Sequence, residues 1–349
     1  MKLYSNSIFV LFFCSALALA GCKEKQKMQE VKITDTGSQV EVSIDGKPFT
    51  TYIYPDNIMK PVLWPLLSPG GNRLTRSFPM EEKEGDRADH PHHVGIWFNY
   101  GDVNGLDFWN NSEAIPEEKR SAYGTILHRS IDKAESGEGK GVLLTSSEWL
   151  SPDNQVLLQE STRFDFIASS PDIWLIDRTT TLKAVADTVR FTDNKEGMFA
   201  IRVARELELP SDKPTDLVDS HGVVTRVEEM DNSNITGNYR SADGTEGEKV
   251  WGTRSRWMKL SGHINTEDLS LIIVDNPSNV GYPTYWHARG YGLFSANPLG
   301  QKIFSDGKEE LNFQLIKGES TVFKYRMIVA SKDLGIEKID KLADEFAQP

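Results

Sequence analysis

The sequence contains only two cysteines among its 349 residues, Cys14 and Cys22. Both lie near the N-terminus, so the body of the chain that follows them has no thiol. This excludes a disulfide framework, thiolate catalysis and cysteine-based metal sites from that body.

Positive charge and long apolar runs are also scarce. The chain has 39 Lys and Arg against 51 Asp and Glu, a net charge of −12, so we expect no basic surface for a nucleic acid. The longest apolar run, Ile8 to Ala20, is shorter than the roughly 20 residues that span a bilayer. The serine elbow, the P-loop and the Rossmann fingerprint are missing, which argues against serine-elbow acyl transfer and nucleotide chemistry.

The N-terminal segment has the organisation of a secretory signal. Lys2 precedes the apolar run, and small residues close it. Residues 19–22, Leu-Ala-Gly-Cys, resemble a bacterial lipobox, which implies a signal peptide over 1–21 and diacylation of Cys22. The alternative is an ordinary signal peptide cut beside an incidental cysteine. Acyl anchoring predicts a cell-envelope lipoprotein, in the periplasm or outer membrane, with residues 22–30 as a solvated tether.

Apolar residues in the rest of the chain mostly recur with a period of two. Val40, Val42 and Ile44 alternate before the turn dipeptide Asp45-Gly46, which predicts a hairpin. We therefore predict an all-β fold, one large antiparallel β-sandwich forming a single domain over 31–349. Other observations that support it are alternation at 164–166, 311–315 and 323–327, a turn at 152–154 and long strands over 174–191.

Two segments depart from this pattern. Ile336, Ile339, Leu342, Ala343 and Phe346 fall on one face of a helix after residue 333, and we expect this short C-terminal helix to pack against a sheet edge. Residues 207–250 are polar and rich in turn formers, which indicates an excursion or long loop over the sandwich.

The densest cluster of chemically competent side chains lies between Asp89 and Trp109. If His90 and His92 are extended they share a face, with His93 opposite, and Pro91 favours a strand edge or an entrance loop. The three imidazoles are candidates for proton transfer or substrate binding; the alternative is hydrogen-bonded structural histidines. Candidate ligand contacts nearby are Arg73, Arg76, Trp97, Tyr100 and Trp109. For the aromatic residues among them, the alternative is a place in the core.

Two further clusters complete the candidate set. Glu196 lies in a charged turn, where it is a candidate acid or base; a solvated turn is the alternative. The strand-like segment that follows contains Arg202, a further candidate ligand contact. Residues 283–300 contain His287, a candidate catalytic group, in a segment whose polar side chains are expensive to bury without partners. Candidate ligand contacts there are Tyr285, Trp286, Arg289 and Asn297.

We assign no cofactor, although a bound metal stays an alternative. His90, His92, His93 and His287 supply imidazoles that copper or zinc accepts. Their spacing matches no zinc helix motif, and Pro91 prevents the segment from being helical throughout.

The segments DHPHHVGIWFNYGDVNGLDFW (89–109), DNKEGMFAIRVA (193–204) and PTYWHARGYGLFSANPLG (283–300) together resemble a bacterial family of unknown function labelled "methane oxygenase PmoA". The resemblance covers most of residues 48–330. The methane monooxygenase subunit of that name is a polytopic membrane protein, whereas this sequence has no spanning segment, so we reject methane oxidation.

The same family is distantly similar to the galactose-mutarotase-like β-sandwiches of aldose epimerases, some polysaccharide lyases and glycosidase accessory domains. In those epimerases a histidine protonates the ring oxygen and a glutamate deprotonates the anomeric hydroxyl. The resemblance implies that a histidine among 90, 92, 93 and 287 takes the first role and Glu196 the second.

Three functional hypotheses follow. The first is an enzyme that acts on a carbohydrate ligand, especially an acidic or oxidised sugar, by acid–base chemistry of the epimerase, lyase or hydrolase type. The second is a non-catalytic carbohydrate-binding surface lipoprotein. The third is a metal-dependent oxidoreductase.

Overall fold

The computed structural model describes residues 1–2 and 28–348. The signal peptide, Cys22 and most of the tether predicted from the sequence lie outside these residues. The tether prediction reached residue 30, but Glu30 already begins the first strand. None of the helices in the described part of the chain is long and apolar enough to cross a membrane.

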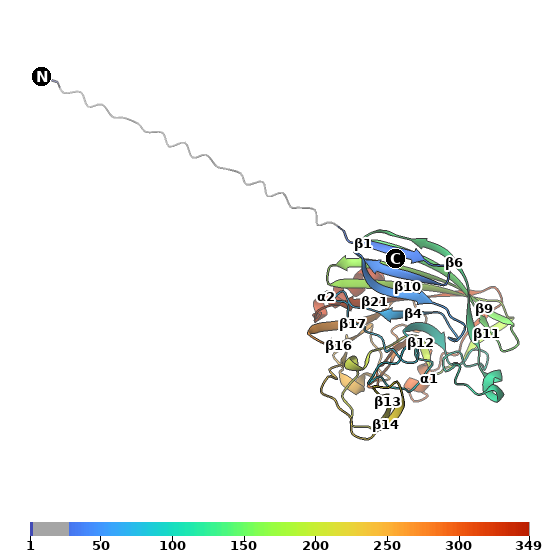
Figure 1. The fold of residues 1–349 in the computed structure, drawn as a ribbon. Coiled ribbons are helices and arrows are strands. Elements are labelled where there is room, and N and C mark those ends of the chain that lie inside the picture. Colours follow the sequence, from blue (N-terminus) through green and yellow to red (C-terminus); the bar gives the residue numbers. More distant parts are fainter. Residues whose placement is uncertain (3–27, 349) are drawn as a thin grey trace.

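Two large antiparallel sheets form a sandwich, which confirms the predicted fold class (Figure 1). The nine-stranded sheet contains, in spatial order, β18 (Tyr285–Arg289), β19 (Leu293–Asn297), β12 (Gly197–Arg202), β5 (Ile96–Tyr100), β4 (Val62–Leu66), β3 (Lys47–Ile53), β2 (Gln39–Ile44), β1 (Glu30–Asp35) and β7 (Gly137–Glu138). The eight-stranded sheet contains β15 (Asn238–Ser241), β16 (Trp257–Ile264), β17 (Glu267–Asp275), β21 (Ser320–Ala330), β10 (Ile173–Ala184), β9 (Val156–Ser170), β8 (Lys140–Leu150) and β6 (Thr125–Glu135).

Smaller elements surround the sandwich. Two-stranded sheets pair β11 (Thr188–Phe191) with β20 (Phe313–Ile316), and β13 (Thr215–Val218) with β14 (Val224–Val227). The helices are α1 (Gln301–Phe304), α2 (Ile336–Ala347) and the 3₁₀ turns η1 (Glu117–Ala122), η2 (Arg205–Leu207) and η3 (Gly247–Val250). Segment 207–250 thus forms a hairpin at the end of the molecule far from β1, and then returns to the eight-stranded sheet as β15 (Figure 1).

The predicted hairpin shows how local sequence directs the fold. Val40, Val42 and Ile44 are buried while Glu41 is exposed, and β2 pairs with β3 with Ile44 opposite Lys47. Asp45 and Gly46 both have positive φ, 49° and 74°, as a two-residue type I′ turn requires. The predicted strand at 323–327 lies within β21, whereas the one predicted at 311–315 begins two residues later, as β20, which pairs with β11.

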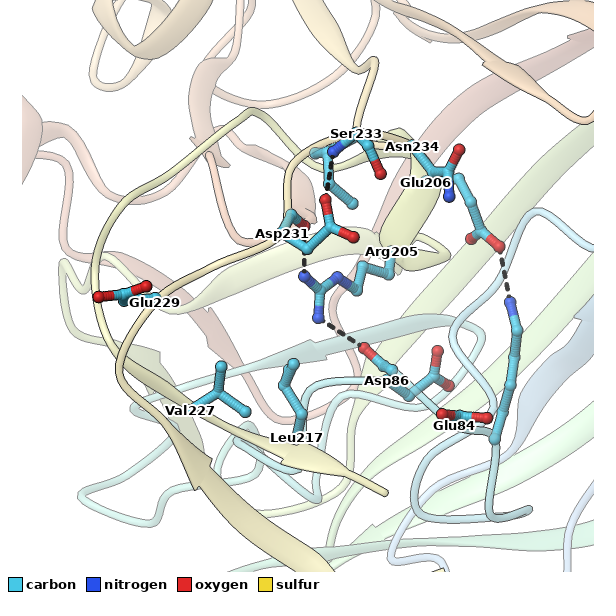
Figure 2. Close-up of a pocket in the computed structure, with 13 residues that line it drawn as sticks. Glu84, Asp86, Arg205, Glu206, Leu217, Val227, Glu229, Asp231, Ser233 and Asn234 are labelled. Carbon is cyan, nitrogen blue, oxygen red and sulfur yellow. Dashed lines mark hydrogen bonds and ion pairs between the residues drawn. The ribbon is translucent and has the colours of Figure 1, made fainter. Parts of the chain in front are cut away.

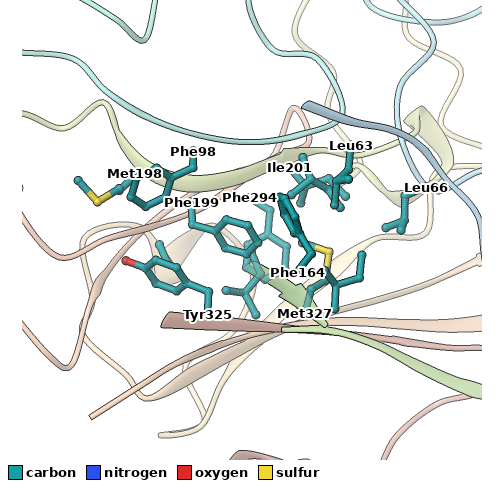
Figure 3. Packing of buried hydrophobic residues seen from close by; sticks show 14 of the residues in the cluster. Leu63, Leu66, Phe98, Phe164, Met198, Phe199, Ile201, Phe294, Tyr325 and Met327 are labelled. Carbon is teal, nitrogen blue, oxygen red and sulfur yellow. The ribbon is translucent and has the colours of Figure 1, made fainter. Parts of the chain in front are cut away.

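The main core lies between the two sheets (Figure 3). Phe98, Phe199 and Phe294 come from the nine-stranded sheet, and Phe164 and Tyr325 from the eight-stranded sheet. Phe199 and Tyr325 stack with ring centroids 5.0 Å apart, which joins β12 to β21 across the sandwich. The core thereby fixes β12, the strand that follows Glu196.

The C-terminal helix is where the sequence predicted, but its docking differs from the prediction. Ile339, Leu342 and Ala343 of α2 pack with Ile272 of β17 and Ile328 of β21. Because these are inner strands of the eight-stranded sheet, α2 covers the outer face of that sheet and not its edge. An amphipathic helix buries more apolar surface against a face than against a narrow edge.

Candidate functional site

The three candidate segments converge on the outer face of the nine-stranded sheet. Along β5, Ile96 and Phe98 point into the main core, so Trp97 between them points outward. Trp97 packs there with Trp109 and Ala200 in a second buried cluster. Loop 89–95 covers this cluster and brings three imidazoles to it.

Residues 89–95 form a loop with a tight turn, one of the two arrangements that Pro91 favoured, so the condition that His90 and His92 are extended is not met. His90 has a positive φ of 44°, and the His93 amide donates to the His90 carbonyl at 2.9 Å. His90 and His93 therefore lie on the same side, with parallel rings 4.9 Å apart, and not on opposite faces.

Arg76 stabilises the turn through hydrogen bonds to backbone carbonyls. Its guanidinium donates to the backbone carbonyls of Arg87, Asp89, His90 and His93 at 2.7–3.1 Å. Only 2% of Arg76 is exposed. The residue was a candidate ligand contact, but the structure uses its donors to hold the loop.

Four rings form a continuous stack in the order Tyr291, His90, His93, Trp97. Successive centroids are 5.2, 4.9 and 5.1 Å apart, with interplanar angles of 3°, 4° and 19°. His92 meets His93 edge-on at 4.3 Å. The His90 side chain is 41% exposed, so it brings the stack to the protein surface.

Asp89 is the charged centre of this region. Its Oδ1 accepts from Arg76 at 2.8 Å and from Arg202 at 2.7 Å, and its Oδ2 lies 3.4 Å from Nδ1 of His90. Burial opposes ionisation of Asp89, but the His90 hydrogen bond and the charges of Arg202 and Arg76 outweigh it and hold the pKa of the carboxyl well below its usual range. Asp89 is therefore an anion that orients His90.

The second half of the site is the pair formed by His287 and Glu196. His287 Nδ1 lies 3.6 Å from Glu196 Oε2, and the His287 ring stacks on Trp109 at 6.5 Å. The side chain of His287 is 4% exposed and that of Glu196 is 15% exposed. Asn297 donates to the carbonyls of Asn194 and Lys195, which fixes the turn that presents Glu196.

Burial keeps the inner imidazoles neutral. It is the main cause that lowers the pKa of His92 to about 2 and that of His287 to about 3, with added repulsion from Lys60 and Lys195 respectively. The pKa of His93 is also lowered well below its usual value. Among the described residues, no partner reaches the buried nitrogens His92 Nε2, His93 Nε2, His287 Nδ1, Trp97 Nε1 and Trp109 Nε1.

Unpartnered buried nitrogens are rare in proteins, and their concentration here marks a site that polar ligand atoms or water can complete. Trp97 and Trp109 are 0% exposed, so their rings are too deeply buried for a ligand to stack on them.

Several other candidates take structural positions. Tyr100 and Trp286 lie in the main core, where the Tyr100 hydroxyl donates to the Thr192 and Leu299 carbonyls. Tyr285 bonds Glu309 and stacks on Phe304. Arg73 pairs with Glu81. Of these contacts, the one between Tyr285 and Phe304 continues to the imidazole cluster, which we define as His90, His92, His93 and His287, because Phe304 also meets His287 edge-on with ring centroids 6.1 Å apart.

Arg202 and Arg289 differ in access to ligand. Arg202 is 0% exposed and is shared by Asp89, His93 and the ring of Tyr291. Arg289 is exposed and lies over the ring of Trp251, 5.5 Å from its centroid. Arg289 therefore keeps donors for a ligand, whereas Arg202 positions the stack.

A pocket of about 270 Å³ adjoins the ring stack through Tyr291. Its lining residues are Arg87, Ser211, Lys213, Glu248, Trp251, Ala288, Arg289, Gly290 and Tyr291. Cations outnumber carboxylates in this lining although the chain as a whole carries a charge of −12. The pocket therefore favours an anionic or hydroxyl-rich ligand with an apolar face.

A larger pocket of about 440 Å³ lies beside the β13–β14 hairpin (Figure 2). Its cations already have partners: Arg205 donates to the carbonyls of Gly85 and Asp231, and Lys83 pairs with Glu206. No histidine is among the lining residues in the described part of the chain. We therefore take the imidazole cluster as the candidate functional site.

Residues 39–344 match a family of unknown function (DUF6807), a range that contains every residue of the imidazole cluster. The chain belongs to this family. No curated protein matches it. The family's description assigns no activity, so the site itself must carry the functional argument.

Sequence reasoning missed two residues of this DUF6807 site. Tyr291 ends the ring stack, and its signal was available because it lies in the same segment as His287. The pKa of the Tyr291 phenol is raised to about 12. Burial is the main cause, the charges of Glu196 and Asp89 add to it, and the charge of Arg202 opposes it. Glu208 bonds Arg87 at 2.5 Å below the pocket, and no local pattern marked it.

The described residues offer no metal-binding cluster. Among residues 1–2 and 28–348, no group of three or more His, Cys, Asp or Glu side chains is arranged to hold a metal ion. His90 and His93 stack through their ring faces, whereas His92 meets His93 edge-on.

Proposed function

We propose that this protein acts on a carbohydrate by acid–base chemistry at the outer-face cluster. The observation that carries the proposal is the meeting of a carboxylate and imidazoles from distant segments: Glu196 lies beside His287, and Trp109 joins the His287 ring to that of His93. Proton transfer to and from a sugar needs such groups on one surface.

The proposed roles follow from exposure and charge. Glu196 takes a proton from the substrate, because it is partly exposed and its Oε2 faces the neutral His287, while its Oε1 is paired with Lys195. His90 donates a proton on the other side, because its side chain is 41% exposed to substrate and its Nδ1 lies 3.4 Å from Oδ2 of Asp89, which orients the ring. His93, Arg76 and Arg202 are positioning residues.

The 270 Å³ pocket supports an acidic sugar as the substrate class. Tyr291 and Trp251 offer aromatic rings, and Arg289 and Lys213 offer donors for a carboxylate. The resemblance of the sequence to galactose-mutarotase-like sandwiches agrees with epimerisation, elimination or hydrolysis.

The test begins with binding of the full-length protein to neutral sugars, uronic acids and keto-sugars, measured by thermal shift. Sugars that bind are then followed by NMR for anomeric exchange or cleavage and by ultraviolet absorbance for the double bond that elimination forms. We expect Glu196→Gln to lose at least about 100-fold in turnover while binding is kept, as removal of a general base does.

The matched control is Glu138→Gln, at an exposed glutamate of β7 on the opposite edge of the same sheet. It should leave turnover unchanged. Binding without turnover in the wild type would support the second hypothesis, a carbohydrate-binding protein, which the 36% exposed Trp251 in the pocket also favours. Failure of every sugar to bind would contradict both.

We also propose that the protein is a lipoprotein of the cell envelope, because residues 19–22 resemble a lipobox. Metabolic labelling with a fatty-acid probe should mark the wild type and not Cys22→Ser. Equal labelling of both would contradict this proposal.

A further inference from the structure

A second pocket, of about 240 Å³, touches the candidate site through His92. It lies between the segments 57–60, 79–80, 91–94 and 111–114. Its walls combine apolar side chains such as Met80 and Val94 with a few polar groups. The proton-transfer roles proposed above do not use it.

Lys60 is the unusual residue in this pocket, because it is a buried cation. It is 2% exposed, its Nζ donates to the backbone carbonyl of His92 at 2.7 Å, and Nζ lies 5.6 Å from the centre of the Trp97 ring. Within the described part of the chain, no carboxylate pairs with it at ion-pair distance. Lysines are almost never this buried without such a partner.

The environment favours the neutral amine. Burial lowers the pKa of Lys60 to about 7, against the opposing attraction of Asp107. The other titratable groups that face it are His92 and, in the pocket wall, Glu113. A desolvated lysine in a mostly apolar pocket is the usual setting for an amine nucleophile.

We propose that Lys60 captures a small aldehyde or ketone in this pocket as an imine. The amine nitrogen forms a bond to the carbonyl carbon, and the carbonyl oxygen leaves as water with the two hydrogens of the amine, so no further reactant is needed. His92 lines the same pocket as a neutral imidazole with Nε2 unpartnered among the described residues, and it can relay a proton from nitrogen to oxygen. The inference goes beyond the proposed carbohydrate function and does not depend on it.

The test treats the full-length wild-type protein with glycolaldehyde and cyanoborohydride at pH 7, which reduces an imine to a stable secondary amine. Peptide mapping by mass spectrometry then compares modification of Lys60 with that of exposed Lys183 and Lys308. An amine with a pKa near 7 is neutral on the order of 10³ times more often at this pH than one with the ordinary value near 10.4. Allowing for its lower nucleophilicity, we expect at least about tenfold faster labelling at Lys60.

The rate of Lys60 labelling should also reach half its maximum near pH 7, whereas labelling of the exposed lysines should still rise above pH 9. Lys60→Arg should remove the fast phase, because a guanidinium forms no imine under these conditions. Labelling of exposed lysines with Lys60 unmodified, or one common rate for all three, would overturn the proposal. The wild-type measurement needs no variant to fold, and neither Glu196 nor sugar binding enters it.

Discussion

Nη1 of Arg202 lies 3.3 Å from Nδ1 of His93. A guanidinium has only donors, so Nδ1 of His93 must accept, and the hydrogen of the neutral ring is then on Nε2. Burial, with repulsion from His92 and Arg202, holds the pKa of His93 well below its usual value. The charge and the tautomer of the His93 ring are therefore both determined by the neighbours of that ring.

The first prediction concerns that tautomer. Nitrogen-15 NMR of histidine-labelled protein at pH 6 should show the His93 imidazole with a protonated Nε2 and a bare Nδ1, and Arg202→Met should alter the two nitrogen shifts of His93. The exposed His221 provides a reference spectrum in the same sample. A His93 resonance with both nitrogens protonated at pH 6 would contradict the assignment.

The second prediction is a pH dependence of stability. His287 has a folded-state pKa of about 3, below the value near 6.5 of an unfolded chain, so the unfolded state binds more protons in between. Its contribution is fully present above pH 6.5 and is lost as the pH falls, by up to about 1.4 kcal/mol per pH unit. His287→Asn should flatten the fall in unfolding free energy between pH 6.5 and 5, measured by denaturant titration.

The comparison between variant and wild type matters because other groups act in the opposite direction. Burial raises the pKa of Glu208 and of Asp275 to about 7, so their contributions are largest at low pH and decline as the pH rises toward 7. The wild-type curve alone is therefore not diagnostic. His221→Asn, at an exposed histidine, should leave the curve unchanged, and equal slopes for His287→Asn and wild type would refute the prediction.

Local elements of the fold were predictable because their signals are local. The hairpin of β2 and β3 needs only alternating residues and Asp45-Gly46, which one short window contains. The helix α2 was likewise visible in its periodicity, but the face on which it docks depends on strands far away in sequence. Alternation tells which residues share a face and not what covers that face.

The candidate site was predictable in composition and not in geometry. His287 and Glu196 meet only because β12 pairs with β19 and β19 with β18, and that register is set by long-range core packing. Trp97 points outward as its strand position implies, yet loop 89–95 buries it. Lys60 carried no local signal, since its environment comes from four separate segments.

The third prediction concerns a buried ion pair in the core. Arg178 donates to Glu160 at 2.8 Å, and Glu160 also accepts from Trp149 Nε1 at 2.8 Å. Arg178→Met leaves the carboxylate without its cation, and we expect a loss of about 3–5 kcal/mol in unfolding free energy.

Adding Glu160→Gln should recover part of that loss, because the amide oxygen still accepts from Trp149 and no charge stays buried. The exposed pair Arg129 and Glu148 serves as a control, for which Arg129→Met should cost about 1 kcal/mol or less. Additive losses in the double variant would show that the two residues are not coupled.

The fourth prediction tests how the loop is joined to β5. Gly95 has a positive φ of 58°, and a Cβ placed on it would lie 2.2 Å from the Leu63 carbonyl oxygen on the neighbouring strand. Gly105 has a φ of 80° but open space around it, so Gly105→Ala should cost only the left-handed backbone penalty of about 1–2 kcal/mol. Gly95→Ala adds a clash with backbone that no side-chain rotation relieves, so its loss of unfolding free energy should exceed that of the control.

Because loop 89–95 then shifts, the His90 and His93 resonances should move in Gly95→Ala and stay in place in Gly105→Ala. Equal losses in the two variants, with both sets of resonances unmoved, would mean that the close approach of Gly95 to β4 does not position the loop.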